Sequence, residues 1–399
     1  MTLAISQAGC YDTDVMTSMS WLFSPGVLES FGVRRGIALA TIYDVAKAAG
    51  VSPKTVSRVL NGDAPVGRET RKAVEAAMAE LGYVPSNAAR MMRSNRSGLI
   101  GLVTGALSHK LEPMEPTGLP DLYIVQGIQK VMADSGKTLI IADTGGTSAK
   151  VPQLVRTFLQ HRVEALVYVA DYHQQVSLDT GAGNCPVVLV NCFDADGTPA
   201  IVPDDERCQF DLVTDLVRSG HERIAYLTLD PAMVATELRS QGYRAALEAA
   251  GIPYDGELEL MARRNVEDDD GGLLQRALDS MLALDRPPTV ICCGNDEMAL
   301  RLYGLVRSRG LRIPEDVSVA GFDNYRAIAE TLYPPLTTVE LPYLAMGQRA
   351  AEIALGMIKG EDGQLAGPEM VPGPVHWRSS VTALNSVTKF RSNTGSTFS

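Results

Sequence analysis

Basic side chains gather in one short part of an otherwise acidic chain. Residues 41–97 carry nine Lys and Arg against five Asp and Glu, a net charge of +4. The whole 399-residue chain has a net charge of −11, so the remainder carries −15. Lys and Arg neutralise the phosphates of nucleic acids, whereas an acidic surface is repelled by them. This distribution predicts a DNA-contacting head on a body that avoids DNA.

The sequence offers little to catalysis or to metal binding. It contains no GxSxG nucleophile elbow, no P-loop, no HExxH and no GxGxxG turn after a strand. The acidic run at residues 268–270 is interpreted as a solvated loop. The five histidines lack ligand spacing, and the six cysteines show no CxxC pattern. We therefore expect a protein that is not an enzyme, with no catalytic residues, no metal site and no cofactor.

Cysteine usage and hydropathy point to a compartment. The adjacent Cys292 and Cys293 lie in an apolar run, as packed thiols do in a reducing compartment. No stretch approaches the roughly 20 apolar residues that cross a bilayer. Asp12 and Asp14 precede the first apolar stretch, which argues against a secretion signal. These patterns predict a cytoplasmic protein without membrane contact.

The basic segment has the pattern of a helix-turn-helix unit, with helices expected over residues 42–49, 52–61 and 68–81. Ser52 is placed to cap the second helix, and Pro53 falls at its first position, where its missing N–H has no cost. An ordinary αα-hairpin shares this packing but does not account for the basic charge. Small or apolar residues occupy the positions that hold the two helices together: Val45, Ala46, Ala49, Gly50, Val51, Val56 and Val59.

Beyond residue 97, apolar β-rich runs alternate with amphipathic stretches. Near-continuous apolar strands between helices predict parallel sheets buried on both faces. The strands are too many for one small sheet, so we expect two doubly wound lobes with a cleft at the carboxyl ends of their strands. The expected strands cover residues 99–103, 138–142, 165–169, 187–190, 224–229, 289–293 and 317–322.

These patterns divide the chain into five segments. Residues 1–40 are interpreted as a disordered extension, with a DNA-contacting arm through Arg34 and Arg35 as the alternative. The head covers residues 41–84, and a hinge or linker covers residues 85–97. The body covers residues 98–383, and residues 384–399 are a Ser-, Thr- and Asn-rich tail that we expect to be disordered.

The run TIYDVAKAAGVSPKTVSRVLNG, which begins at Thr41, resembles the head of the LacI/GalR family of bacterial repressors. The resemblance continues to residue 382 through shorter matches in the family's order: GHERIA, QGYRAAL, GNDEMAL, GFDN and PPLTTVELPYLAMGQRA. It implies an all-α three-helix helix-turn-helix head on an α/β, two-lobed, periplasmic-binding-protein-like body with parallel doubly wound sheets. It further implies a homodimeric transcription regulator, most often a repressor, on a near-palindromic double-stranded DNA operator. A small-molecule effector, sugar-like by this resemblance, would lie between the lobes.

The resemblance places the second head helix in the major groove. Lys54 is the expected base-reading residue, since Lys can donate to guanine O6 and N7, with phosphate neutralisation as the alternative. Thr55 and Arg58 would add base or phosphate contacts, while Ser52 and Asn61 would position the DNA backbone.

Residues 86–94 resemble the family's hinge helix, which lies in the minor groove. Ala88 and Ala89 would allow close approach to the DNA. Met92 stands where relatives usually carry a leucine wedge that opens a base step. A plain interdomain linker is the alternative.

Four residues are carried into the effector site by the resemblance. Arg239 aligns with an arginine that grips a polar group, Asn295 and Asp323 align with strand-end Asn and Asp residues, and Asn191 stands where relatives place Asp or Asn. Together these types donate to and accept from hydroxyl groups. The alternative for each of these residues is a local role, in which its side chain caps the helix that follows the strand. For Asp296, the residue after Asn295, capping is the favoured role. The long loop at residues 108–122 lacks the family's aromatic pair, so sugar specificity is not carried over.

A solute-binding protein of the transport kind, without DNA function, is the competing interpretation. Such a protein would carry a secretion signal and no helix-turn-helix unit, and this sequence shows the reverse. Binding of duplex DNA with a steep salt dependence separates the two.

Overall fold

The computed structural model describes residues 40–62, 65–84, 96–105, 120–145, 147–177, 183–263, 272–361, 363, 365 and 367–384. The chain divides into two compact units, residues 1–95 and residues 96–399. The expected N-terminal extension before residue 40, the tail from residue 385 and residues 85–95 of the expected hinge lie outside the described residues.

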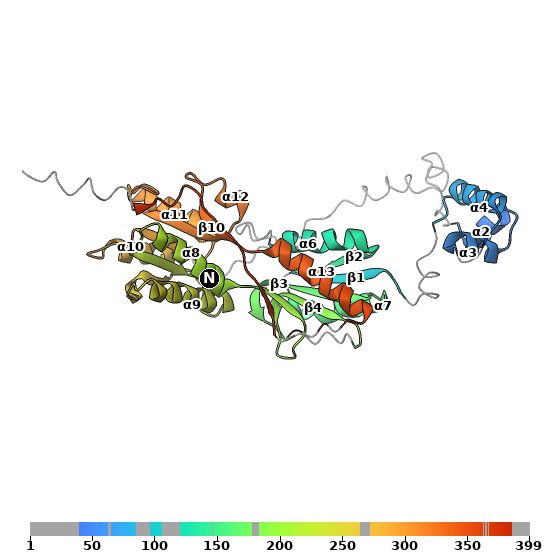
Figure 1. Cartoon of the computed structure of the whole chain (residues 1–399), viewed down its shortest axis with the longest axis horizontal. Helices are drawn as coiled ribbons and strands as arrows, with labels where there is room; N and C mark the ends of the chain where they lie inside the picture. Colours follow the sequence, from blue (N-terminus) through green and yellow to red (C-terminus); the bar gives the residue numbers. More distant parts are fainter. Residues whose placement is uncertain are drawn as a thin grey trace, which may run out of the picture. The chain divides into compact units, whose positions relative to one another are not determined.

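The described part of the first unit consists of three helices around a small apolar core (Figure 1): α2 (Ile42–Ala48), α3 (Pro53–Asn61) and α4 (Arg68–Leu81). The three predicted helices are confirmed. Four residues expected to hold the first two helices together are buried in this core, and α4 contributes two more: Val45, Ala46, Val56 and Val59 with Val74 and Ala77.

Local hydrogen bonds begin and end these helices. Thr41 and Asp44 form a reciprocal capping box at the start of α2. Ser52 caps α3 as expected, since its hydroxyl oxygen accepts from the N–H of Thr55 at 3.1 Å. Gly62 and Gly82 end α3 and α4 in the left-handed region, where glycine has no Cβ to clash. The head is therefore specified largely by its own local sequence.

The second unit contains two sheets, each with its own helices. Lobe A has a six-stranded parallel sheet in the order β11-β5-β4-β3-β1-β2. Helices α6 (Pro120–Ser135) and α13 (Tyr343–Lys359) cover one face, and α7 (Val151–Gln160) covers the other, next to the 3₁₀ turn η2 (Ser148–Lys150). The strands are β1 (Leu99–Thr104), β2 (Thr138–Asp143), β3 (Ala165–Gln175), β4 (Val187–Phe193), β5 (Ala200–Pro203) and β11 (Glu369–Val371).

Lobe B has a second six-stranded sheet, in the order β12-β10-β9-β8-β6-β7, which is parallel except for the pair β10–β12. Helices α8 (Asp205–Arg218) and α9 (Val234–Ala249) cover one face, and α10 (Gly272–Leu282) and α11 (Asp296–Ser308) cover the other. The short α12 (Arg326–Ala329) and the 3₁₀ turn η3 (Gly256–Leu258) complete the lobe. The strands are β6 (Ile224–Thr228), β7 (Glu259–Met261), β8 (Val290–Cys293), β9 (Ser318–Asp323), β10 (Thr337–Glu340) and β12 (Val375–His376).

All seven expected strands are present, and the two-lobed, doubly wound architecture is confirmed. The chain crosses between the lobes three times, from β5 to α8, from β10 to α13 and from β11 to β12. In Figure 1, α13 accordingly lies beside α6 in lobe A, although β10 before it belongs to lobe B. The sequence periodicity did not reveal the short strands β5, β7, β10, β11 and β12.

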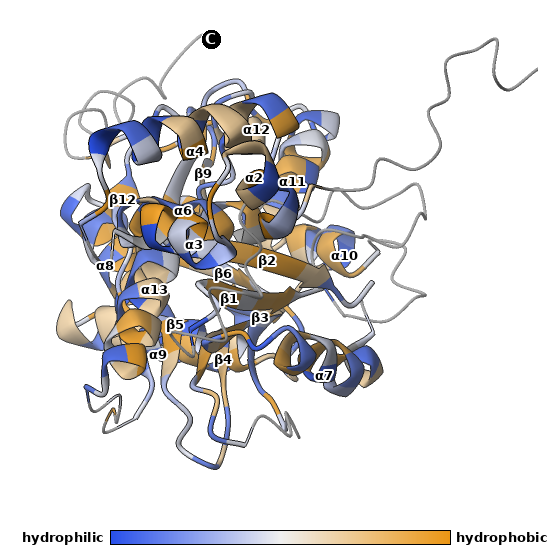
Figure 2. Cartoon of the chain, turned by 90° about the vertical axis from the view of Figure 1, so that its right-hand side faces the viewer, coloured by the Kyte–Doolittle hydropathy of each residue, from blue (hydrophilic) through white to orange (hydrophobic). Residues whose placement is uncertain are grey.

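The burial pattern explains the layers. Figure 2 shows the inner strands β1 and β3 as hydrophobic, whereas α7 has a polar and an apolar side. Strands buried on both faces and helices buried on one face are what an open parallel sheet requires. Within the described ranges, none of the helices combines the length and the apolar character needed to span a bilayer.

Helices α6 and α13 touch backbone to backbone, which only glycine allows. A Cβ added at Gly347 would overlap the carbonyl oxygen of Ile124, and one at Gly127 would overlap that of Leu344. We expect Gly347→Ala to force the helices apart and to lower the free energy of unfolding by about 1–3 kcal/mol in a denaturant titration.

The matched control is Gly304→Ala in the middle of α11, where an added Cβ meets nothing within 4 Å. Alanine removes backbone freedom there, so this variant should keep or gain up to about 1 kcal/mol of stability. Equal stability of the two variants would contradict the close-contact argument.

Candidate functional site

The candidate DNA-reading residues lie along α3. Lys54 and Arg58 are exposed one helical turn apart, while Val56 and Val59 on the opposite side are buried in the head core. An exposed basic edge on a rigidly packed helix suits insertion into a DNA groove.

The remaining candidates of the head differ in what the structure says of them. The Ser52 hydroxyl lies 2.9 Å from the hydroxyl of Thr55, so both side chains are also engaged at the start of α3. Asn61 is the last residue of α3. The three expected minor-groove residues, Ala88, Ala89 and Met92, lie outside the described residues.

In lobe B, Arg239 projects from α9 and is 4% exposed. Its Nε donates to Asp205 at 2.7 Å, and its Nη1 donates to the carbonyl oxygen of Gly294 at 2.6 Å. The ring of Phe322 lies against the guanidinium, with 3.6 Å between the ring centroid and Cζ. The side chain is therefore fixed at the carboxyl ends of β8 and β9.

Asp205 and His173 complete this arrangement, and neither was predicted from the sequence. The second carboxylate oxygen of Asp205 lies 2.7 Å from Nδ1 of His173, on β3 of lobe A. Burial alone would raise the pKa of Asp205, but the charge of Arg239 and the hydrogen bond of His173 outweigh it and hold the pKa below its ordinary value. The only signal in the sequence was the acidic start of α8, where Asp204, not Asp205, caps the helix.

Asp323 ends β9 in a strained conformation, with φ +117°. No hydrogen bond to its carboxylate is found in the part of the chain that the structure describes. Enclosure by the protein raises the pKa of this carboxyl well above its ordinary value, and the nearby charge of Arg239 opposes that shift. Because no hydrogen bond from the described residues engages it, the carboxyl of Asp323 is available to accept a hydrogen bond from a ligand or to donate one. The strained backbone of this residue holds the carboxyl in place.

Asn295, not Asp296, caps the helix that follows β8. Asn295 is the N-cap of α11, accepting from the N–H of Met298 at 2.9 Å. Asp296 is fully buried and accepts from the hydroxyl of Thr338 at 2.6 Å and from the N–H of Tyr325 at 2.7 Å. The expectation that Asp296 caps the helix is therefore wrong, because its side chain points back into the sheet and fixes the loop after β9.

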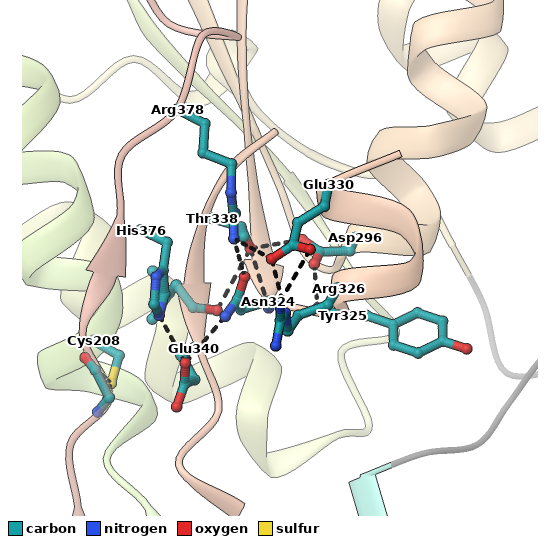
Figure 3. A network of polar contacts seen from close by, with 12 residues as sticks. Cys208, Asp296, Asn324, Tyr325, Arg326, Glu330, Thr338, Glu340, His376 and Arg378 are labelled. Atoms are coloured by element: carbon teal, nitrogen blue, oxygen red, sulfur yellow. Dashed lines mark hydrogen bonds and ion pairs between the residues drawn. The ribbon is translucent and has the colours of Figure 1, made fainter. Parts of the chain in front are cut away.

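A chain of polar contacts extends from this loop to the crossing strands (Figure 3). Asn324 accepts from Arg378 at 2.7 Å and donates to Glu340 at 3.0 Å. Nε2 of His376 lies 2.7 Å from the same carboxylate oxygen of Glu340. Because Glu340 ends β10 and His376 lies on β12, the network holds together two crossings and the loop that carries Asp323.

The fourth candidate, Asn191, lies in lobe A. It is buried on β4 in the left-handed region, with φ +59°, and donates to the carbonyl oxygen of Ala170 at 3.1 Å. The structure thus brings Arg239, Asn295 and Asp323 to one edge of lobe B. Among the described residues, no hydrogen bond or ion pair joins Asn191 to these three. Nor do the described residues contain a group of three or more His, Cys, Asp or Glu that could hold a metal ion.

A three-helix head with an exposed basic helix, followed by a two-lobed α/β body with polar side chains at a sheet edge, defines a class of ligand-responsive DNA-binding regulators. Family models agree. Residues 41–86 match the bacterial regulatory proteins of the lacI family, and residues 213–381 match the periplasmic binding protein-like domain.

Whole-chain relatives agree as well. The HTH-type transcriptional repressor PurR of Vibrio atlanticus is 34% identical over 350 residues, which cover 87% of this chain and 100% of that repressor. The chain belongs to the LacI family of bacterial regulatory proteins and is a DNA-binding transcriptional regulator.

Solved structures show the same architecture. The Lac repressor dimer bound to operator and the anti-inducer ONPF is 27% identical, with a TM-score of 0.69, and the match covers 86% of this chain and 100% of that one. A LacI-family regulator from Rhizobium etli is 33% identical, with a TM-score of 0.63, over 72% of this chain and 100% of that one. The competing interpretation of a solute-binding protein without DNA function is not favoured, because the head belongs to the match.

The environment of Asp296 predicts a dependence of stability on pH. Burial raises the pKa of Asp296 to about 7, so between its ordinary value and pH 7 the folded protein retains a proton that the unfolded chain has lost. Stability should therefore fall as the pH rises through this window. Asp296→Asn cannot ionise, so relative to the wild type it should gain about 1–3 kcal/mol between pH 5 and pH 8 in thermal or denaturant unfolding.

Asp285→Asn, at an exposed aspartate of the same lobe, serves as the control and should follow the wild-type pH profile. A stability difference between Asp296→Asn and the wild type that stays constant with pH would show that Asp296 does not titrate in this range.

Proposed function

We propose that this regulator acts as a repressor that binds a near-palindromic operator as a homodimer and responds to a small polar effector, a sugar or a related metabolite, held between lobes A and B. The observation that carries the effector proposal is the convergence of Arg239, Asn295 and Asp323 at one sheet edge. The backbone of Asp323 is strained there, and its carboxyl has no hydrogen bond from the described residues. These groups offer donors and acceptors of the kind that hydroxyl groups need. Asn191 contributes from lobe A in this proposal.

The domain roles follow from the same proposal. Residues 41–84 read the operator through Lys54, Thr55 and Arg58, with Ser52 and Asn61 positioning the DNA backbone. Residues 85–97 form the hinge, in which Ala88, Ala89 and Met92 meet the minor groove. Residues 98–383 bind the effector and form the dimer. The chain performs no catalysis and works in the cytoplasm, where its operator is.

Effector binding changes DNA affinity only to the extent that the effector prefers one arrangement of the lobes. Three crossings connect lobes A and B, so a ligand that contacts both lobes biases their relative position. The Lac repressor, which is known as a dimer on its operator with an anti-inducer bound, supports such a coupling in this family.

The proposal is tested by selecting bound sequences from a random duplex library with the purified full-length protein. A dimer should enrich a near-palindrome whose half-sites lie about one helical turn apart. The selection is repeated in the presence of sugars and related metabolites, because a regulator that requires a co-repressor binds its operator only when that co-repressor is present. No enrichment under any of these conditions would overturn the operator proposal.

Lys54 is the residue to change on the enriched operator. Lys54→Ala should weaken binding by about 1–3 kcal/mol and relax the preference at one base position of each half-site. Lys72→Ala removes an equal charge from an exposed position of α4 and should leave that preference unchanged. A uniform loss of affinity with an unaltered base preference would show that Lys54 contacts phosphate only.

A further inference from the structure

The buried link between the two lobes is a run of three charged or polar side chains. His173 on β3, Asp205 at the start of α8 and Arg239 on α9 are joined by two contacts of 2.7 Å. All three are at most 6% exposed. His173 comes from lobe A and the other two from lobe B. None of the patterns in the sequence assigned Asp205 or His173 to the effector site.

Asp205 changes what Arg239 can offer to a ligand. A free guanidinium presents five N–H groups and a full positive charge, which suit a phosphate or a carboxylate. In this chain Nε already donates to Asp205, and Nη1 donates to Gly294. The carboxylate also cancels the charge at close range, where water is excluded and the interaction is strong. What remains for an effector is N–H donors of a neutral ion pair.

The described groups around Asp323 and Arg239 are mostly acidic. Besides Asp205, the acidic groups of Asp296 and Glu297 lie close enough to raise the pKa of Asp323, and the charge of Arg239 opposes that rise. Among the described residues, Glu297 is paired with Arg263 at 2.8 Å, so that arginine is already engaged. An anionic group placed at Arg239 would therefore meet a guanidinium whose charge Asp205 already balances.

We propose that Asp205 is a positioning residue of the effector site, which neutralises Arg239 so that the site accepts uncharged or cationic effectors and excludes those with a phosphate or carboxylate at the guanidinium. The proposal rests on the proposed role of Arg239 in effector binding. His173 holds the second oxygen of Asp205 and so keeps the first oxygen on Nε of Arg239. The neighbouring Asp323 then finds its partner among the hydroxyl or amino groups of the effector.

Inorganic phosphate is the probe, titrated at constant ionic strength and followed by thermal unfolding and by hydrogen exchange of peptides from residues 234–249. The wild type should show no saturable response. Asp205→Asn keeps the size of the side chain and leaves Arg239 charged, so it should bind phosphate at least about tenfold more tightly than the wild type. The double variant Asp205→Asn with Arg239→Gln should lose this gain.

Asp211→Asn is the matched control, because it removes the same charge from an exposed ion pair on the same helix without touching Arg239. If Asp205→Asn gains no more affinity for phosphate than Asp211→Asn does, the proposal is overturned. If Asp205→Asn does not fold, the wild type decides: saturable phosphate protection of residues 234–249 overturns the proposal, and its absence supports it.

Operator binding by the same preparations separates this proposal from the function on which it rests. Asp211→Asn, whose exposed ion pair lies outside the Arg239 site, should bind the selected operator without phosphate as the wild type does. Failure of the wild type to bind any operator would count against the proposed function, while the phosphate comparison would still decide the role of Asp205.

Discussion

A guanidinium group buried at the edge of a β-sheet sets conditions for everything packed around it. Removing its charge from water costs several kcal/mol unless a carboxylate and further acceptors are close. Here Arg239 has Asp205, the Gly294 carbonyl and the face of Phe322. These partners come from α8, from the loop after β8 and from β9, so α9 can dock only when those elements are in place. Through His173 the same requirement reaches the other lobe.

The crossings between the lobes explain how such a contact can exist. Because β5 continues into α8, the residue that enters lobe B from lobe A is also the partner of Arg239. The other two crossings are tied together by Glu340 and His376, and through Asn324 to the loop of Asp323. Movement of one lobe against the other would therefore act on the polar groups that we assign to the effector. Coupling of this kind needs an element with more than one arrangement, and the crossings are the natural candidate.

The head follows a different logic. Its apolar core is small, so local features at the helix ends determine where its helices begin and end. These are the Thr41 capping box, the Ser52 cap and the left-handed glycines at positions 62 and 82. The outer side of α3 therefore does not have to pack against the core of the head. Lys54 and Arg58 are consequently exposed on a helix whose other side is fixed, as reading DNA requires.

The sequence by itself determined the head, the alternation of strands and helices, and the polar residues at the strand ends. Each depends on short-range periodicity or on a cap within a few residues, and these can be read along the chain. Tertiary structure alone decided that Asn295 caps α11 while Asp296 turns into the sheet, and that Asp205 meets Arg239 and His173. The contacts of Asp205 with His173 and Arg239, and of Asp296 with Thr338, join residues 32 to 42 positions apart. A buried ion pair of that separation leaves no local pattern, because only the docking of α8, α9 and β3 brings the charges together.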